Sequence, residues 1–381
     1  MGSHRLPTTK INGMVSGGNR HPLPFSNNKM DTQITLPTYE SQDWHKYNLA
    51  KTQEKRLFYE LLNELCSLIP EEVHEKGRKP IPVKDLVFTS ALKLYNGFSL
   101  RKIDYDIREA EMCGYIKKKP HYNRLSEFFN HNLTYLLLQK LVTITALPLK
   151  ELEDDFSMDA SGFGSYQYER WMRTRFARPK TEWRNYLKGH VCIGTRTNVI
   201  CSAEITYGNF NDGKQAPILL SQINRNFKPK TINGDKGYSS YKIMQLIDSI
   251  GAQPFIAFQD RVIKESKKAP EIWNKMFRYF RDHKELFLKN YHKRSNVETV
   301  FAMVKMRLGE FLKSKNYESQ RNELLMKFIV HNITCLVQEI FERDVKVDFK
   351  ECMNSYKEPK EIKIPEKPEK SIGVLIIPDR Y

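Results

Sequence analysis

The chain has 381 residues, which leaves room for two or three domains and a sizeable hydrophobic core. Apolar residues make up 40% of it, and its 19 Tyr and 21 Phe favour a folded protein over a disordered one. Its 62 Lys and Arg against 45 Asp and Glu give a net charge of +17, which favours a polyanionic partner, nucleic acid first and an anionic membrane surface second.

The first 42 residues are rich in Ser, Asn, Pro, Thr and Gly without hydrophobic periodicity, so residues 1–42 are predicted to be a mobile polar arm. Helical patterns begin near Trp44, and residues 43–150 are predicted to form an α-helical domain. The leucines of its first helix repeat at helical spacing until Pro70, and a later apolar helix is predicted at about 124–146.

Two helices in the middle of this domain have the outline of a helix-turn-helix. The first begins at Val83, Gly97 breaks it, and Ser99 is a good N-cap for the second. Three basic side chains of the second helix are placed to meet DNA phosphates: Arg101, Lys102 and Arg108. An ordinary αα-hairpin has the same outline, so both interpretations stay open.

From Asp154 the hydrophobic period changes to that of strands, and residues 151–345 are predicted to form an α/β catalytic domain. Five strands are predicted, at 156–159, 191–195, 199–206, 231–235 and 253–258. Three strands in succession, followed by strand, helix and strand, indicate a mixed five-stranded sheet with flanking helices. In a sheet ordered 3-2-1-4-5, the first and fourth strands are neighbours.

Three acidic residues are placed where this sheet can bring them together. Asp159 ends the first strand, Asp235 ends the fourth, and Glu298 lies on a predicted helix over 291–305. Converging carboxylates repel one another unless a divalent cation neutralises them, and oxygen ligands without His or Cys select Mg²⁺ or Mn²⁺ over Zn²⁺. Each Asp taken singly is more ordinary, because an Asp after a strand is usually a turn-former.

The helix over 291–305 presents a polar face around Glu298. At about 100° per residue, Tyr291, Arg294 and Lys305 fall with Glu298 in an arc of roughly 60°. Such a face can place a metal ligand beside phosphate clamps. The alternative is a surface helix with an Arg294–Glu298 pair that contributes a few tenths of a kcal/mol.

A second candidate contact with nucleic acid lies between Gly162 and His190, where aromatic and basic residues alternate. Seven cations there match phosphates: Arg170, Arg173, Arg175, Arg178, Lys180, Arg184 and Lys188. Among them, Arg175, Arg184 and Lys188 are the strongest DNA-binding candidates. The alternative is a solvated basic connector whose aromatic residues cover the sheet edge.

The acids and the basic helix together resemble the DDE insertion-sequence transposases that carry the Y-R-E-K signature. Tyr291, Arg294, Glu298 and Lys305 follow its spacing, and MDASGF and GDKGY surround Asp159 and Asp235. The resemblance covers roughly residues 75–345. It implies an RNase H-like core, and two Mg²⁺ ions (with Mn²⁺ as substitute) bound by the three acids. It also implies that Tyr291, Arg294 and Lys305 hold DNA phosphates beside the scissile bond.

The same resemblance predicts the biological setting. The partners would be transposon-end DNA and target DNA, bound by a homodimer because two ends must be cut and joined together. Scattered cysteines without zinc spacing, and no secretory signal, fit a cytoplasmic protein. The resemblance implies that it is nucleoid-associated and prokaryotic. The most apolar runs carry residues such as Lys140 and Asn332, so no membrane partner is predicted.

Two other functions compete with this prediction. One is a DNA-binding protein that has lost catalysis, which the complete acidic triad argues against. The other is an RNase H-like nuclease that cleaves without joining.

After Val347 the chain becomes rich in Lys, Glu and Pro, so residues 346–381 are predicted to be a solvated linker and tail. An apolar island near its end, 372–377, is a candidate strand or plug for a partner.

Overall fold

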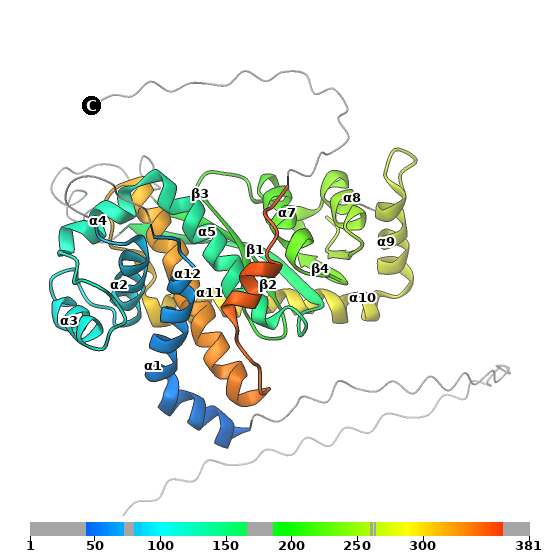
Figure 1. Cartoon of the computed structure of the whole chain (residues 1–381). Helices are drawn as coiled ribbons and strands as arrows, with labels where there is room; N and C mark the ends of the chain where they lie inside the picture. Colours follow the sequence, from blue (N-terminus) through cyan, green and yellow to red (C-terminus); the bar gives the residue numbers. More distant parts are fainter. Residues whose placement is uncertain (1–42, 72–79, 166–185, 260–261, 263, 361–381) are drawn as a thin grey trace, which may run out of the picture. The chain divides into compact units, whose positions relative to one another are not determined.

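The computed structural model describes residues 43–71, 80–165, 186–259, 262 and 264–360 (Figure 1). The predicted arm at 1–42, the end of the tail, and the candidates Arg175 and Arg184 lie outside the described residues. The described residues from Asp43 onward belong to one compact unit.

The N-terminal part of this unit is helical, as predicted. Asp43 caps the first helix by accepting hydrogen bonds from the backbone N–H groups of His45 and Lys46. The helices are α1 (Trp44–Ser67), α2 (Val83–Tyr95), α3 (Asp104–Met112), α4 (Tyr122–Asn130) and α5 (Asn132–Ala146), followed by the 3₁₀ turn η1 (Leu147–Leu149).

The predicted cap of the second hairpin helix is wrong. Helix α3 begins at Asp104, and the Ser99 hydroxyl accepts only a long bond, 3.4 Å, from the Lys102 N–H within a turn. Acidic residues at the start of α3 favour that later start because they face the positive end of the helix dipole. Helix α3 carries four acids and one arginine, Arg108, which pairs with Asp104. This charge is unfavourable for the predicted phosphate contact.

The sheet has the predicted order β3-β2-β1-β4-β5. Its strands are β1 (Asp155–Ser165), β2 (Tyr186–Gly194), β3 (Ile200–Tyr207), β4 (Thr231–Gly234) and β5 (Gln253–Ile256), and a sixth short strand, β6 (Phe311–Leu312), pairs with the end of β1. Strands β1, β2 and β3 are antiparallel, whereas β4 runs parallel to β1 and β5 parallel to β4. This is the predicted mixed α/β sheet with one additional strand.

Strand β1 continues six residues beyond its predicted end at Asp159. Its pairing with β2 runs from Phe156 opposite Gly194 to Gly164 opposite Tyr186, so the glycines did not end the strand. Gly162 has a packing reason, because a Cβ there would lie 3.0 Å from the Tyr186 ring. A long strand is stabilised by its partner, which the local sequence does not show.

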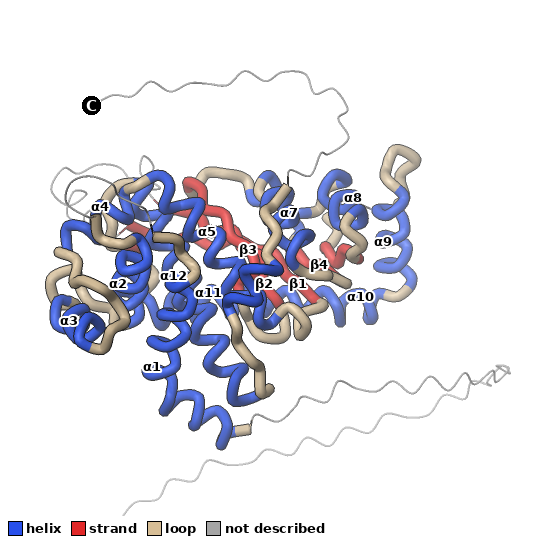
Figure 2. The backbone as a smooth tube through the Cα atoms, viewed as in Figure 1, coloured by secondary structure: helices blue, strands red, loops and turns tan. Residues whose placement is uncertain are grey.

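Helices cover both faces of the sheet (Figure 2). They are α7 (Ala216–Asn226), α8 (Tyr241–Ser249), α9 (Glu271–Asp282), α10 (Lys284–Tyr291), α11 (Ser295–Leu308) and α12 (Tyr317–Glu342). On one face, Phe163 of β1 meets Phe301 of α11 and Phe328 of α12 edge-on. On the other face, Phe156 packs against Phe227, at the end of α7. Residues of β1 that face opposite ways therefore pack against helices on the two faces of the sheet.

Helix α12 runs through the middle of the molecule, between α1 and α5 and against β2 and β3 (Figure 1). It is long and apolar enough to cross a membrane, but 83% of its most apolar window is buried inside the protein, as in the core helix of a folded domain. Asn332 closes the β3 edge: its Oδ1 accepts from the Ile200 N–H and its Nδ2 donates to the Ile200 carbonyl, both at 2.8 Å. Paired edges do not attract a further strand.

The predicted linker begins as folded structure. Helix α13 (Phe349–Ser355) is capped by Asp348, whose side chain accepts from the Glu351 N–H. Phe349 is fully buried, and its N–H donates to Glu64 of α1 at 2.8 Å. Pattern reading missed this turn because one buried aromatic residue, not a periodic face, holds it to the core.

Candidate active site between β1, β4 and α11

The first two acids stand at the same level of the sheet because of strand register. Parallel pairing of β1 with β4 ends at Met158 opposite Gly234, so Asp159 and Asp235 each follow that last pair. Asp159 is 18% exposed, and its Oδ1 accepts from the N–H of Ala160 at 2.8 Å. The prediction that the first and fourth strands are neighbours is thus confirmed. Their pairing brings the two aspartates side by side.

Asp235 also shapes the turn after β4. Its Oδ1 accepts from the Gly237 N–H at 2.8 Å and so caps the 3₁₀ turn η3 (Lys236–Tyr238). A Cβ at Gly237 would lie 2.9 Å from that oxygen, which explains the glycine. The turn-former interpretation is therefore correct for this one oxygen, while the position beside Asp159 remains that of a site residue.

The predicted single helix over 291–305 is divided in the structure. Tyr291 ends α10, a 3₁₀ turn η4 (His292–Arg294) follows, and α11 begins at Ser295. The polar face predicted around Glu298 is therefore not one continuous helix face. Tyr291 lies before the break, with its ring stacked against Phe287 at 6.5 Å between centroids. The break follows from tertiary packing, since Ser157 of β1 donates to the Lys293 carbonyl at 3.2 Å.

Arg294 joins the third acid to the first. Its Nη2 lies 2.6 Å from Glu298 Oε1, and its Nη1 lies 3.3 Å from Asp159 Oδ2. The guanidinium is 22% exposed, whereas Glu298, in the first turn of α11, is 58% exposed. The arginine therefore bridges two carboxylates from different elements, which is more than the i,i+4 pair that the sequence offered as an alternative.

Negative charge accumulates at this point of the sheet. The pKa of Asp159 is raised to about 6, first by burial and then by the charges of Asp235 and Glu298. The Ala160 N–H and the Arg294 charge act in the opposite direction. An added cation would stabilise the charged form of Asp159, which burial and the two neighbouring acids disfavour.

Lys305 reaches the same face of β1 from the far end of α11. Its Nζ lies 2.7 Å from the Ser161 hydroxyl and 5.0 Å from the centroid of the Phe163 ring. Burial lowers its pKa. Asp159, Ser161 and Phe163 alternate along β1 and share one face, so period-two spacing was the signal that identifies Ser161 as a site residue.

Lys188 is placed differently from the prediction. Its Nζ is held by Asp212 Oδ1 at 2.8 Å and by the Phe210 carbonyl at 3.2 Å, and its side chain is 18% exposed. Behind this pair lies His190, fully buried, whose pKa is lowered to about 4 by burial. The His190 Nε2 lies 2.8 Å from the Thr206 hydroxyl. Lys188 thus orders the turn after β3 in this structure.

The donor set of the three acids fits a hard divalent cation, because it consists of carboxylate oxygens only. The arrangement of the three acids fits a divalent cation less well than their chemistry does. Over the described ranges, no three Asp, Glu, His or Cys side chains are close enough together to hold a metal ion. The reason is visible in the contacts: a cationic side chain, Arg294, lies between Asp159 and Glu298.

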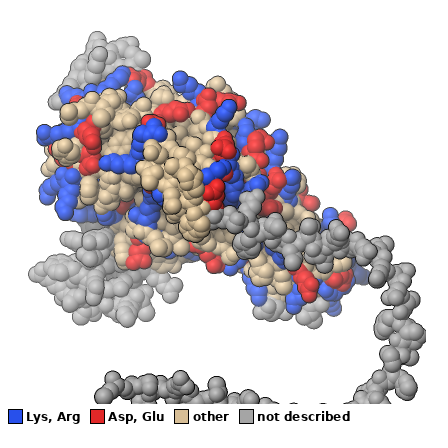
Figure 3. Space-filling model, turned by 90° about the horizontal axis from the view of Figure 1, so that it is seen from below, with Lys and Arg blue, Asp and Glu red and all other residues tan. Residues whose placement is uncertain are grey.

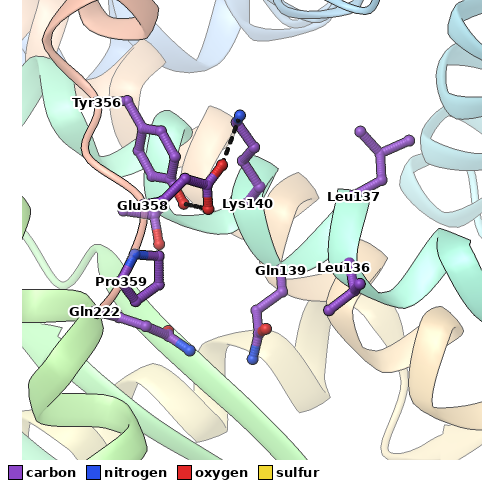
Figure 4. A pocket seen from close by; sticks show the side chains of 9 residues that line it. Leu136, Leu137, Gln139, Lys140, Gln222, Tyr356, Glu358 and Pro359 are labelled. Carbon is purple, nitrogen blue, oxygen red and sulfur yellow. Dashed lines mark hydrogen bonds and ion pairs between the residues drawn. The ribbon is translucent and has the colours of Figure 1, made fainter. Parts of the chain in front are cut away.

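A cavity of the described part of the chain lies away from the three acids. A hollow of about 430 Å³ opens between α5, α7 and the segment after α13, where Lys140 pairs with Glu358 at 3.0 Å (Figure 4). None of the three acids lines it. Seen from below, Lys and Arg are interspersed with Asp and Glu over the surface instead of forming one continuous positive patch (Figure 3).

Comparisons with known proteins give a family match and a structural neighbour. Residues 151–333 match the family model described as "Transposase DDE domain". A similar solved structure is a chain of the cryo-EM structure of a piggyBac transposase synaptic complex with hairpin DNA. It is 12% identical, with a TM-score of 0.35, over 79% of this chain and 76% of that one. No curated protein matches this chain. The family match covers every strand of the described sheet and all three acids, and residues 151–333 are a transposase DDE domain.

Proposed function

We propose that this chain is an insertion-sequence transposase that cleaves the ends of its element and joins them to target DNA, with Asp159, Asp235 and Glu298 as the catalytic acids. The observation that carries the proposal is the register of β1 and β4, which sets Asp159 beside Asp235. The Arg294 bridge brings Glu298 to the same place. The family match supports the reaction class.

The three acids would hold two Mg²⁺ ions, with Mn²⁺ as a substitute. When bound, such ions activate a nucleophile and stabilise the leaving oxygen in phosphodiester chemistry. Asp159, buried and crowded by the other two acids, gains most from a neighbouring cation. Asp235 would be oriented by its bond from the Gly237 N–H. Glu298, more exposed, would close the site from α11.

The cations and the phenol of the site would hold DNA. Lys305 contacts Ser161 on β1, Arg294 ends η4 directly before α11, and Tyr291 ends α10. Neither Arg nor protonated Lys binds a metal, since both carry only donors, so phosphate oxygens are their fitting ligands. The partners would be transposon-end DNA and target DNA, bound by a homodimer in the cytoplasm of a prokaryote, at its nucleoid.

A strand-transfer assay tests the proposal against its closest rival. The substrate is a pair of end sequences taken from the DNA that flanks the reading frame, with Mg²⁺ and a target plasmid. A transposase nicks the ends and joins the freed 3′-hydroxyls to the plasmid, whereas a nuclease yields nicked ends only. Asp159→Asn, Asp235→Asn and Glu298→Gln should each abolish both steps. Full nicking by any one of them would remove that residue from the site.

A further inference from the structure

Arg294 contacts carboxylate oxygens that a metal ion bound by the three acids would also need. It makes two charge-assisted contacts, with Glu298 at 2.6 Å and with Asp159 at 3.3 Å. These acids come from α11 and β1, so the guanidinium is the connection between the two elements at the site. Arg294 is the last residue of the 3₁₀ turn η4, and α11 begins at the next residue.

The charges of the three acids explain why a positively charged side chain is needed at this site when no metal is bound. Asp159 is mostly buried and feels the charges of Asp235 and Glu298, so three carboxylates without a counter-charge repel one another. A guanidinium fork is the side chain best suited to bridge two carboxylates. The same oxygens cannot all serve Arg294 and a divalent ion, because both require the acid oxygens at contact distance.

We propose that Arg294 is a built-in substitute for the metal: it latches Asp159 to Glu298 in the metal-free protein, and metal binding displaces it from at least one of the two acids. This inference rests on the proposed function, because it takes these acids as metal ligands. Once displaced, the guanidinium is available to a DNA phosphate beside the ions. Metal binding and the release of Arg294 for contact with a DNA phosphate are then coupled.

Direct metal binding to the full-length protein tests the latch. Mn²⁺ titration followed by the EPR signal of the free ion gives the dissociation constant without DNA and without turnover. Arg294→Met removes the competing cation, so Mn²⁺ should bind roughly tenfold more tightly than to the wild type. Arg294→Lys, which keeps the charge but loses the fork, should fall between them.

Lys293 offers a matched control one residue away. It pairs with Asp155 at 2.6 Å and contacts none of the three acids in the described structure. Lys293→Met removes the same charge, so a general electrostatic effect would tighten Mn²⁺ binding equally in both variants. The latch predicts less than about a twofold change for Lys293→Met, since screened charges act weakly at a distance.

Thermal melts supply a second readout. Without metal, Arg294→Met should melt below the wild type, because two carboxylates lose their counter-charge. Saturating Mn²⁺ should then raise its melting temperature by more than that of the wild type, since stabilisation follows the affinity. Should Arg294→Met fail to fold without metal, Arg294→Lys and the wild type still give the comparison.

The two failures are distinguishable. If Asp159→Asn and Glu298→Gln bind Mn²⁺ as tightly as the wild type, the proposed metal site itself is wrong. If both weaken binding while Arg294→Met binds Mn²⁺ no tighter than the wild type, the metal site stands and the latch is overturned. In that case Arg294 supports the site by orienting Glu298.

Discussion

At the scale of single residues, Asp159 gives the site a pH dependence. Its pKa is raised to about 6, so in the folded protein its charged form is disfavoured relative to the unfolded chain. This group therefore lowers stability above pH 6, and the penalty is relieved as the pH falls from 6 towards 4. Asp159→Asn removes the penalty.

The expected result is a metal-free protein that gains stability between pH 7 and pH 5 more strongly in the wild type than in Asp159→Asn. Urea midpoints at pH 5, 6 and 7, without metal, measure it. At pH 7 the variant should equal or exceed the wild type, apart from the loss of its Arg294 contact. A wild type and a variant with parallel pH profiles would contradict the raised pKa.

Lys305 gives a second prediction at this scale. Its Nζ bonds to a neutral hydroxyl, Ser161, so its charge stays available to a phosphate. Each such contact contributes about 0.9 to the slope of log K against log salt for duplex DNA. Lys305→Ala should therefore lower the slope by about one and slow cleavage, while Mn²⁺ affinity stays near the wild type. Lys293→Ala, whose charge is already paired with Asp155, is the control. Equal slopes for Lys305→Ala and wild type would remove Lys305 from the clamp.

At the scale of elements, the turn after α11 fixes where that helix ends. Gly309 has a φ of +83°, which suits glycine, and the buried ammonium of Lys327 donates to the Gly309 carbonyl at 2.7 Å and the Phe311 carbonyl at 2.9 Å. Glu323 accepts from the N–H groups of Lys313 and Ser314, at 3.0 and 2.8 Å. Helix α12 thus anchors the turn that aligns β6 with β1.

Lys327→Met should destabilise the protein by about 1–3 kcal/mol, because two buried carbonyls lose their donor. Loss of a buried charge offsets part of that cost. Hydrogen exchange gives the specific signature: protection should fall first in the turn at 309–314, with α12 itself little changed. Lys350→Met, at an exposed position on α13, is the control. Uniform loss of protection across the sheet would mean that the turn has no special dependence on Lys327.

The elements also show how far sequence reasoning reached. Strand order and the two aspartates were predictable, because hydrophobic period and the ends of strands are local signals. The division of the helix before Ser295, and the Arg294 bridge to Asp159, were not. Both depend on a residue more than a hundred positions away along the chain. The contact of Lys188 with Asp212 was not predictable for the same reason, since the two residues come together only when β2 and β3 pair.

At the scale of the whole molecule, the helical part and the DDE domain share one core. Helix α12 packs on α1, α2, α4 and α5 as well as on β2 and β3, and the buried aliphatic residues form one continuous cluster. A polar link strengthens the connection: Arg307, near the end of α11, pairs with Glu54 of α1, which also accepts from the Tyr95 hydroxyl at 3.1 Å. The predicted boundary at residue 150 therefore lies within a packed interface.

This shared core predicts that the full chain unfolds in one cooperative transition. Splitting residues 43–150 from the sheet would expose both sides of α12, and that apolar area is too large to expose without global unfolding. Calorimetry should give equal calorimetric and van't Hoff enthalpies, with circular dichroism and Trp fluorescence changing together. Glu54→Ala should lower the melting temperature of that single transition, because Arg307 loses its partner, and should not split it. Two resolved transitions in the wild type, one of them shifted by Glu54→Ala, would show instead that the helical region folds as an independent domain and that the α12 interface is a contact between two stable bodies.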